Sequence, residues 1–286
     1  MTATADIHAS AVSAFSAKPD VAQRQDLRHR SANPCPLGHY GRVSESLPGG
    51  WINAVTRVGD TVRRPQQPRS AYVHRLLEHL AAQGWSGAPR FLGVDSENRE
   101  ILTYLPGQAV WRPEHQAVVR TGASLARVAA LARELHDLTE GTPLAHGAAV
   151  VCHNDLSPRN TVYRNAAGGL EPFAFVDWDL AAPGERVHDI AHICWQYLDL
   201  GHAVIDVTEA ARLIRTICDG YGAIDHGDVV DTILWWQDRS RRGIETGAAA
   251  GDPAMVRLRD NGTPARIAAA YGWLAEHRVE LAELLG

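Results

Sequence analysis

Apolar positions along this chain form short alternating runs in its first part and helical spacings over most of the remainder. Runs rich in β-branched residues at 54–58, 61–63 and 100–105 are bounded by glycine, proline or aspartate, which is typical of strands joined by turns. Residues 70–83 instead place apolar side chains three and four positions apart. This spacing predicts a helix that begins at Ser70 and buries Val73, Leu76, Leu77 and Leu80.

Beyond residue 107 the spacing is mainly helical. The stretch 124–139 carries an apolar stripe that would pack a central helix into a core. An Asp-Val-Thr-Glu sequence that starts at Asp206 resembles a capping box and predicts the beginning of another helix. Helices are therefore expected over 124–139, 206–220, 228–246 and 263–285. The chain divides into a strand-rich first part and a larger helical second part.

Length, net charge and the distribution of apolar residues limit the classes of protein to which this chain could belong. At 286 residues the chain can bury two modest hydrophobic cores or one large one. A net charge of −5 and the lack of a basic tract argue against a nucleic-acid partner. No apolar run approaches the roughly 20 residues of a membrane helix, and the first 30 residues do not have the pattern of a signal peptide. We therefore expect a cytoplasmic protein that does not bind a membrane.

The four cysteines are scattered and show no Cys-x-x-Cys spacing: Cys35, Cys152, Cys194 and Cys218. This distribution favours reduced, buried thiols over disulfides or a zinc site. Cys152 stands beside His153, which would also suit a thiol nucleophile, but its place at the end of the Val-Val run favours packing.

The segment with the clearest chemistry runs from His153 to Asn160 and is followed by Asp177 at the end of an apolar run. A phosphoryl-transfer site needs a carboxylate that orients an attacking hydroxyl and accepts its proton. It also needs oxygen ligands that hold Mg2+ against the nucleotide phosphates. His153, Asp155, Asn160 and Asp177 supply that set of groups.

Two β-prone runs lie between Asn160 and Asp177, on either side of a polar, glycine-rich stretch, and they predict a hairpin. If the turn is centred on Gly168 and Gly169, Asn160 pairs opposite Asp177, because the two residues are equally far from that centre. One metal ion would then be within reach of both side chains.

The pattern His-x-Asp-x-x-x-x-Asn, followed by a strand and an aspartate, resembles the aminoglycoside phosphotransferase family. The resemblance extends from about Gly41 to the end of the chain. It implies an α+β, protein-kinase-like fold with a small β-rich N-terminal lobe and a larger helical C-terminal lobe. The expected parts are a flexible extension over 1–40, a nucleotide-binding lobe over 41–105, and a catalytic and substrate-binding lobe over 106–286.

The resemblance also implies roles for single residues. Asp155 would be the catalytic base, Asn160 and Asp177 would bind Mg2+, and ATP or GTP would supply the phosphate. His153 would brace the catalytic loop without taking part in the chemistry. Asp189 lies at the start of an amphipathic segment, where we expect it to cap a helix and to hydrogen-bond the loop.

Backbone groups are expected to contact the nucleotide at two places. Gly49 and Gly50 form a turn between candidate strands, and they would let backbone amides approach the phosphates closely because they lack a Cβ. Tyr104 and Leu105 resemble the hinge between the lobes, where backbone groups would hydrogen-bond adenine.

A cation on the third strand pairs with the nucleotide phosphates in kinase-like folds, and this chain offers Arg63 or Arg64 in place of lysine. The resemblance favours Arg63. The helix that follows usually carries a glutamate that binds this cation, but the equivalent position here is Val73, and Glu78 lies on another face. The usual ion pair is therefore not predicted.

Acidic and aromatic residues in the helical part are candidates for binding an acceptor, although their helical spacing also suits a packed core or a solvated face. These residues are Asp179, Trp235, Trp236, Asp238 and Glu245. We expect an ATP-dependent O-phosphotransferase that acts on a hydroxyl of a small molecule, with an aminoglycoside or related antibiotic as the first candidate. The alternatives are a kinase of a choline-like or homoserine-like alcohol and a nucleotide-binding pseudoenzyme. The sequence leaves the oligomeric state open.

Overall fold

The computed structural model describes residues 44–46, 55–111, 113–201, 204, 206–222 and 224–286. The extension predicted over 1–40 and the turn at Gly49 and Gly50 lie outside the described residues. In the part of the chain that is described, each helix is too short or too polar to cross a lipid bilayer.

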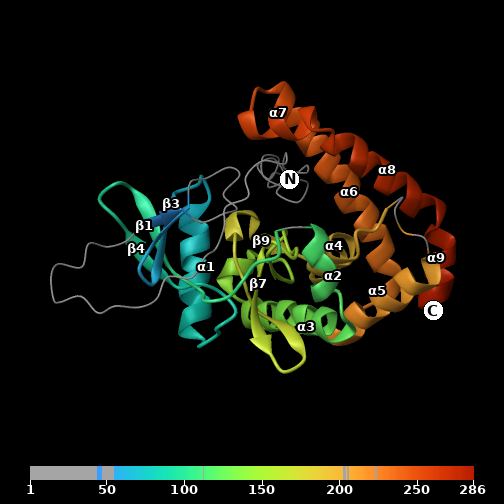
Figure 1. Cartoon of the computed structure of the whole chain (residues 1–286), viewed down its shortest axis with the longest axis horizontal. Helices are drawn as coiled ribbons and strands as arrows, with labels where there is room; N and C mark the ends of the chain where they lie inside the picture. The colour runs from blue at the N-terminus through green and yellow to red at the C-terminus, as the bar shows by residue number, and fades with distance from the viewer. Residues whose placement is uncertain (1–43, 47–54, 112, 202–203, 205, 223) are drawn as a thin grey trace, which may run out of the picture.

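An antiparallel sheet forms the first part of the described chain (Figure 1). Its strand order is β1-β2-β3-β5-β4. β2 and β3 are joined by the predicted turn, in which Gly59 has a φ of 62°, a conformation that glycine adopts readily. The register of β3 and β5 places Arg64 opposite Glu100. The strands are β1 (Ser44–Ser46), β2 (Thr56–Val58), β3 (Thr61–Pro65), β4 (Phe91–Val94) and β5 (Arg99–Thr103).

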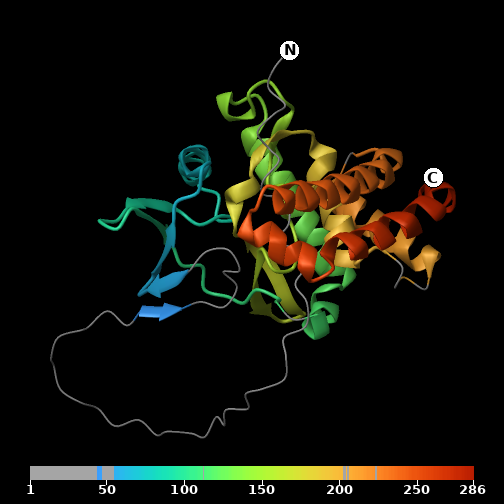
Figure 2. The same cartoon turned by 90° about the horizontal axis from the view of Figure 1, so that it is seen from above.

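Helix α1 (Ser70–Ala82) covers one face of this sheet (Figure 2). Its buried residues include the four that the apolar spacing predicts: Val73, Leu76, Leu77 and Leu80. Ser70 is the first helical residue and not the cap, and its hydroxyl accepts a hydrogen bond from the amide of Gln67 at 2.8 Å. The chain leaves the helix through Gly84, whose φ is 74°.

The second part of the chain is mainly helical, as predicted (Figure 1). α3 lies at its centre, in contact with α4, α5 and strands from both small sheets. Its predicted stripe of Leu125, Val128, Ala132 and Leu135 is fully buried. The helices are α2 (Pro113–Val119), α3 (Gly122–Thr139), α4 (Arg186–Leu198), α5 (Val207–Tyr221), α6 (His226–Ala249), α7 (Pro253–Asp260), α8 (Thr263–Glu276) and α9 (Arg278–Leu285).

One expected helix is divided. The stretch 263–285 forms α8 and α9, which meet at His277. The His277 ring donates through Nδ1 to the carbonyl oxygen of Trp273 at 2.8 Å, next to the backbone bond from its own amide to the same oxygen. A polar side chain that bonds the last turn of a helix favours an end there. The spacing of the apolar residues continues across His277, so the sequence pattern did not predict a break between two helices there.

Two small sheets carry the loops of the candidate site. β6 (Val150–Cys152) pairs with β9 (Ala182–Gly184), and β7 (Thr161–Ala166) pairs with β8 (Gly169–Phe175) to form the predicted hairpin. The turn is centred on Ala167 and Gly168, one residue earlier than predicted, because Gly169 already pairs with Ala166.

A bulge in this hairpin partly restores the predicted pairing. The register shifts by one residue between Val162 and Tyr163. As a result, the amide of Val176 donates to the carbonyl oxygen of Asn160 at 2.9 Å. Asn160 therefore lies opposite Val176, and Asp177 is one residue farther along the chain.

Candidate active site

Asp155 and Asn160 are held together in the loop between β6 and β7. Their side chains are buried, with Asp155 4% and Asn160 2% exposed. The side-chain nitrogen of Asn160, Nδ2, donates to the carboxylate of Asp155 at 2.8 Å and to the backbone carbonyl oxygen of Asp155 at 2.9 Å. These bonds fix the orientation of the Asp155 carboxylate. Because the nitrogen of the Asn160 amide faces Asp155, its oxygen points the other way, where it can serve as a ligand or acceptor.

The loop is fastened to α4 by the buried carboxylate of Asp189. One oxygen accepts from the backbone amide of His153 and the other from that of Asn154, each at 2.8 Å. Asn154 has a φ of 64°, a strained conformation for a residue other than glycine, and this contact helps to hold it. The predicted bond between Asp189 and the loop is therefore confirmed. The predicted cap is wrong, because Glu185 is the N-cap of α4.

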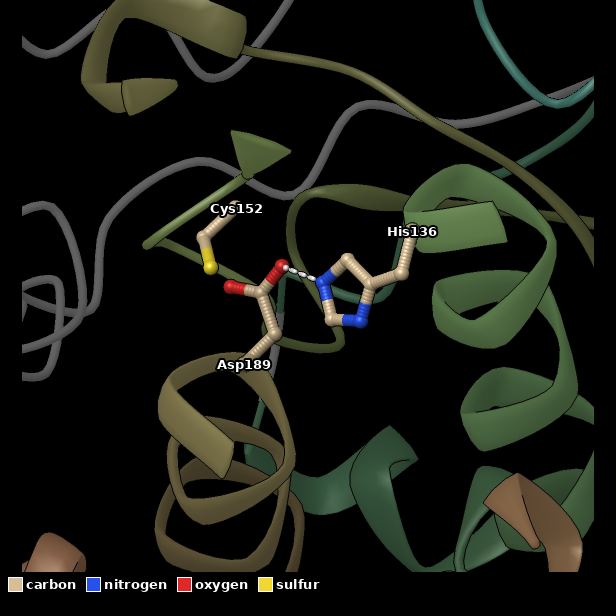
Figure 3. A group of neighbouring side chains, drawn as sticks. All are labelled: His136, Cys152 and Asp189. Carbon is tan, nitrogen blue, oxygen red and sulfur yellow. Dashed lines mark hydrogen bonds and ion pairs between the residues drawn. The ribbon is translucent and has the colours of Figure 1, made fainter. Parts of the chain in front are cut away.

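His136 from α3 completes the group around Asp189 (Figure 3). Its Nε2 donates to the Asp189 carboxylate at 3.1 Å, and its Nδ1 accepts from the Tyr221 hydroxyl at 2.9 Å. Burial alone would raise the pKa of Asp189, but the hydrogen bonds from the His136 ring and from the backbone amide of His153 outweigh it and hold the pKa below its usual value. Asp189 therefore stays ionised in the core.

The ligand atoms of His136, Cys152 and Asp189 all lie within 4.8 Å of one another, a distance that a metal ion could bridge. The contacts favour a hydrogen-bonded network instead. The thiol of Cys152 donates to the carbonyl oxygen of Glu185 at 3.2 Å, and burial raises its pKa well above the usual value, so it remains protonated. Both oxygens of Asp189 already accept from N–H groups. We therefore interpret Cys152 as a packed thiol.

His153 connects the loop to the residue between β8 and Asp177. Its Nε2 donates to the carbonyl oxygen of Val176 at 3.1 Å, and its ring lies 4.6 Å from the centre of the Trp178 ring. Burial lowers the pKa of His153, so the imidazole is neutral. This environment suits the brace expected from the sequence.

Asp177 and Asp179 meet an arginine from the sheet, and that arginine is Arg64. The Arg64 guanidinium lies 3.3 Å from the carboxylate of Asp177 and 2.7 Å from that of Asp179. Its Nε donates to Glu100, which is fully buried. Burial raises the pKa of Asp179 to about 6, although the charge of Arg64 acts in the opposite direction.

Arg63, which the sequence favoured, points elsewhere. Its guanidinium donates to the hydroxyl of Thr61 at 2.7 Å and lies 3.8 Å from Asp95. Successive side chains of a strand point to opposite faces, so Arg63 and Arg64 cannot both face the loop. The structure therefore brings Arg64, and not Arg63, to the two aspartates.

The oxygen groups around Arg64 are of the kind that Mg2+ prefers. Three carboxylates converge on this single guanidinium, so the local charge is negative. The side chain of Asp177 is 42% exposed and accessible to an ion. Carboxylate and amide oxygens are hard ligands, and Asp177 together with Asn160 fits a magnesium site.

The predicted hinge residues follow β5. The amide of Tyr104 donates to the carbonyl oxygen of Asp60 at 2.9 Å, and the Arg57 guanidinium lies 3.8 Å from the centre of the Tyr104 ring. That amide is thus used within the sheet. The adenine contact predicted for the backbone near Tyr104 and Leu105 stays a prediction.

The acceptor candidates on α6 differ in their surroundings. Trp236 is buried, and its indole donates to the carbonyl oxygen of His188 at 2.9 Å, which indicates a packing role. Trp235 is 44% exposed and stacks on the His188 ring at 5.1 Å. The carboxylates of Asp238 and Glu245 both contact Arg241, at 3.0 and 2.9 Å, and Asp238 also pairs with Arg242, so their charge is largely compensated within the helix.

Acidification is expected to destabilise the fold through His192, whose Nδ1 donates to the carbonyl oxygen of Leu156 in the loop at 3.0 Å. Burial lowers the pKa of His192 to about 4, against about 6.5 in an unfolded chain. The unfolded chain therefore binds more protons between these values. The stability contributed by neutral His192 is complete above pH 6.5 and is lost as the pH falls toward 4, by about 2 kcal/mol at pH 5.

The His192→Asn variant keeps a donor near Nδ1 and removes the titration. Urea unfolding at pH 5 and pH 7.5 is expected to show a smaller pH dependence for this variant than for the wild type. His153 and His188, whose pKa values burial also lowers, and Asp179, whose pKa burial raises, contribute to the slope that remains. An unchanged difference between the two pH values would show that His192 does not titrate as proposed.

Comparison with known proteins agrees with this arrangement. The model of the phosphotransferase enzyme family matches residues 44–148 and 140–230. A trifolitoxin immunity protein from Rhizobium leguminosarum bv. trifolii is 30% identical over 269 residues, and the alignment covers 82% of this chain and 96% of that protein.

Two solved structures show a similar fold. A choline/ethanolamine kinase family protein from Mesorhizobium loti has a TM-score of 0.59 at 20% identity, with 85% of this chain and 94% of that chain covered. The GDP complex of aminoglycoside 2'-phosphotransferase-IIIa has a TM-score of 0.52 at 15% identity, with 84% and 93% covered. These likenesses confirm the kinase-like fold that the sequence predicts. From the family match and the relative at 30% identity, the chain belongs to the phosphotransferase enzyme family.

Proposed function

We propose that this protein transfers the γ-phosphate of ATP or GTP to a hydroxyl group of a small molecule. The observation that carries the proposal is the pairing of Asp155 with Asn160 in a loop that is fastened to the strand before Asp177. The contact of Asp177 with the Arg64 guanidinium at 3.3 Å supports a site between the sheet and the helical part. Family membership and the fold support the same chemistry.

Each group has one task in this proposal. Asp155 orients the acceptor hydroxyl and takes its proton as the oxygen bonds to the γ-phosphorus. The bond from the γ-phosphorus to the bridging oxygen breaks, and the nucleoside diphosphate leaves with that oxygen. Mg2+ held by Asn160 and Asp177 would offset the charge of the phosphates. Arg64 takes the role that the sequence assigned to Arg63 and orients the phosphates.

The division of labour along the chain follows from these roles. We propose that residues 41–105 bind the nucleotide and that residues 106–286 carry the catalytic loop and bind the acceptor. Positioning and charge neutralisation would supply most of the rate, because phosphoryl transfer needs little covalent participation from the protein.

The acceptor is proposed to be an antibiotic or toxin that carries a free hydroxyl. The relative at 30% identity is a trifolitoxin immunity protein, which favours a role in protection against a toxic compound. Trp235 is 44% exposed, so part of its indole is accessible for contact with an acceptor. A polycationic aminoglycoside gains less support, because Arg241 and Arg242 compensate the carboxylates of Asp238 and Glu245.

The test is transfer of labelled γ-phosphate, with Mg2+, to aminoglycosides, other antibiotics, hydroxyl-bearing toxins and alcohols such as choline and homoserine. Label on one class of acceptor would establish the reaction and identify that class. Label on choline or homoserine alone would favour a metabolic kinase. Nucleotide binding without transfer to any acceptor would favour a pseudoenzyme.

The two neighbouring arginines are expected to respond differently to the same conservative change. Arg64→Lys keeps the charge but loses the planar fork, so the affinity for Mg-ADP should fall about tenfold. Arg63→Lys alters a side chain that contacts Thr61 and Asp95. The affinity of this variant for Mg-ADP should stay within about twofold of the wild type. Isothermal titration calorimetry measures the Mg-ADP affinity of both variants. A larger loss of affinity in Arg63→Lys than in Arg64→Lys would indicate that Arg63 is the phosphate ligand.

A further inference from the structure

Glu100 is a buried carboxylate with both oxygens occupied. It lies on β5 directly opposite Arg64 on β3, and its side chain is not exposed to solvent. One oxygen accepts from Nε of Arg64, and the other accepts from Nε2 of His74 at 2.6 Å. A carboxylate in this position would be costly without such partners, so the three groups form one unit.

The contact with Glu100 determines which edge of the Arg64 guanidinium faces the loop. Because Glu100 takes the Nε side, the two terminal nitrogens point toward the aspartates. One of them lies 3.3 Å from Asp177 and the other 2.7 Å from Asp179. The planar guanidinium cannot turn without breaking its bond to Glu100. Glu100 therefore orients the group that would meet the phosphates.

His74 connects this unit to helix α1. Its ring stacks on Phe91 of β4 at 3.7 Å between ring centres, with an angle of 11° between the planes. The stack and the bond to Glu100 fix the imidazole between the helix and the sheet. A displacement of α1 would therefore move the partner of Glu100 and, through it, Arg64.

These contacts explain how the chain manages without the helix glutamate that usually pairs with the strand cation. No glutamate of α1 is placed to bind the strand cation, because Val73 is buried in the core and Glu78 is exposed. The carboxylate comes from the neighbouring strand, and the helix contributes a histidine. Helix α1 is therefore still linked to Arg64, through His74 and Glu100 instead of a single glutamate.

We propose that Glu100 and His74 are positioning residues that orient Arg64 for nucleotide binding and make this orientation depend on α1. The inference rests on the proposed function, since it needs Arg64 to bind nucleotide. It does not depend on the identity of the acceptor, because nucleotide binding alone can test it.

The experiment is a double-mutant cycle on the full chain with Glu100→Gln, Arg64→Gln and the double variant, read by calorimetric titration with Mg-ADP and Mg-GDP. Each single change is expected to weaken binding about tenfold, and the double variant should bind no more weakly than Arg64→Gln alone. A purely structural role of Glu100 would weaken binding by the same factor in both backgrounds and would overturn the proposal.

His74 is tested separately, which also serves if Glu100→Gln does not fold. His74→Phe keeps the stack on Phe91 but removes the donor to Glu100, and it should weaken Mg-ADP binding several-fold. His74→Gln retains an N–H donor and should recover most of the affinity. Glu78→Gln, an exposed change on the same helix, is the control and should bind as the wild type does. Equal binding by His74→Phe and the wild type would exclude the role of the histidine.

Failure of this inference differs from failure of the proposed function. If the wild type binds neither Mg-ADP nor Mg-GDP, the proposed function and the inference fall together. If the wild type binds and Arg64→Gln binds weakly while Glu100→Gln is unaffected, only the inference fails.

Discussion

Replacing Asp155 with asparagine is expected to lower the rate of phosphoryl transfer by about a hundredfold to ten-thousandfold, the usual contribution of a positioned general base. The amide has nearly the shape of the carboxylate but cannot accept a proton. Asn160 can still donate to its oxygen, so the loop geometry should persist. The rate is measured as label transferred to the acceptor that the panel identifies, at saturating nucleotide.

Two further measurements separate a lost base from a lost fold. The affinity for Mg-ADP and the temperature of unfolding should stay close to the wild-type values in Asp155→Asn. Asp219→Asn, an exposed change on α5, is the control and should leave the rate unchanged. Transfer at the wild-type rate by Asp155→Asn would remove Asp155 from the mechanism.

The sequence predicted the loop and the hairpin that carry the candidate residues, because these parts are close along the chain. Asp155 and Asn160 lie in the loop before the hairpin and Asp177 lies just after it, so β-propensity and turn residues were sufficient to predict the hairpin that links them. The centre of the turn was wrong by one residue, and the bulge shifted the register again. Both errors concern hydrogen bonds between strands, which composition does not specify.

The contacts around Arg64 could not be predicted in the same way, because they join separate segments. Arg63 and Arg64 are neighbours on opposite faces of β3, and the register with β5 decides which one meets Glu100. One signal was available in the sequence, since Glu100 and Leu102 lie two positions apart in the predicted strand and therefore share a face, and the structure buries both. A charged residue that shares a face with a core leucine needs a partner, and Arg64 is that partner.

The α6 residues show the limit of composition as a guide to function. Tryptophans and acids close together suggested an acceptor surface, but the helix also carries arginines one turn away from the acids. Pairs at this spacing are common on solvated helices and compensate the charge locally. Of the α6 candidates, Trp235 and Glu245 are exposed, but Glu245 pairs with Arg241, so Trp235 is the better candidate for an acceptor contact.

Asp189→Asn is expected to lower the free energy of unfolding by about 3 kcal/mol or more, the usual cost of removing one partner from a buried ionic network. The carboxylate accepts from the amides of His153 and Asn154 and from the His136 ring. An asparagine has one acceptor oxygen, and its NH2 group would face a donor. Urea unfolding measures the loss, and Asp231→Asn, which breaks an exposed pair with Arg278, should cost only about 0–1 kcal/mol.

Asp189→Asn should also loosen the catalytic loop locally, under conditions in which the rest of the chain stays folded. Because asparagine keeps only one acceptor oxygen, at least one of the amides of His153 and Asn154 loses its acceptor, and the hydrogen exchange of that amide should become faster than that of amides in α3. The left-handed conformation of Asn154 would then lose its support, and Asp155 beside it would lose its orientation. Asp189→Asn should therefore slow transfer even at temperatures where the chain is fully folded. If the exchange of these two amides and the rate are both unchanged, the buried carboxylate stabilises the core without positioning the base.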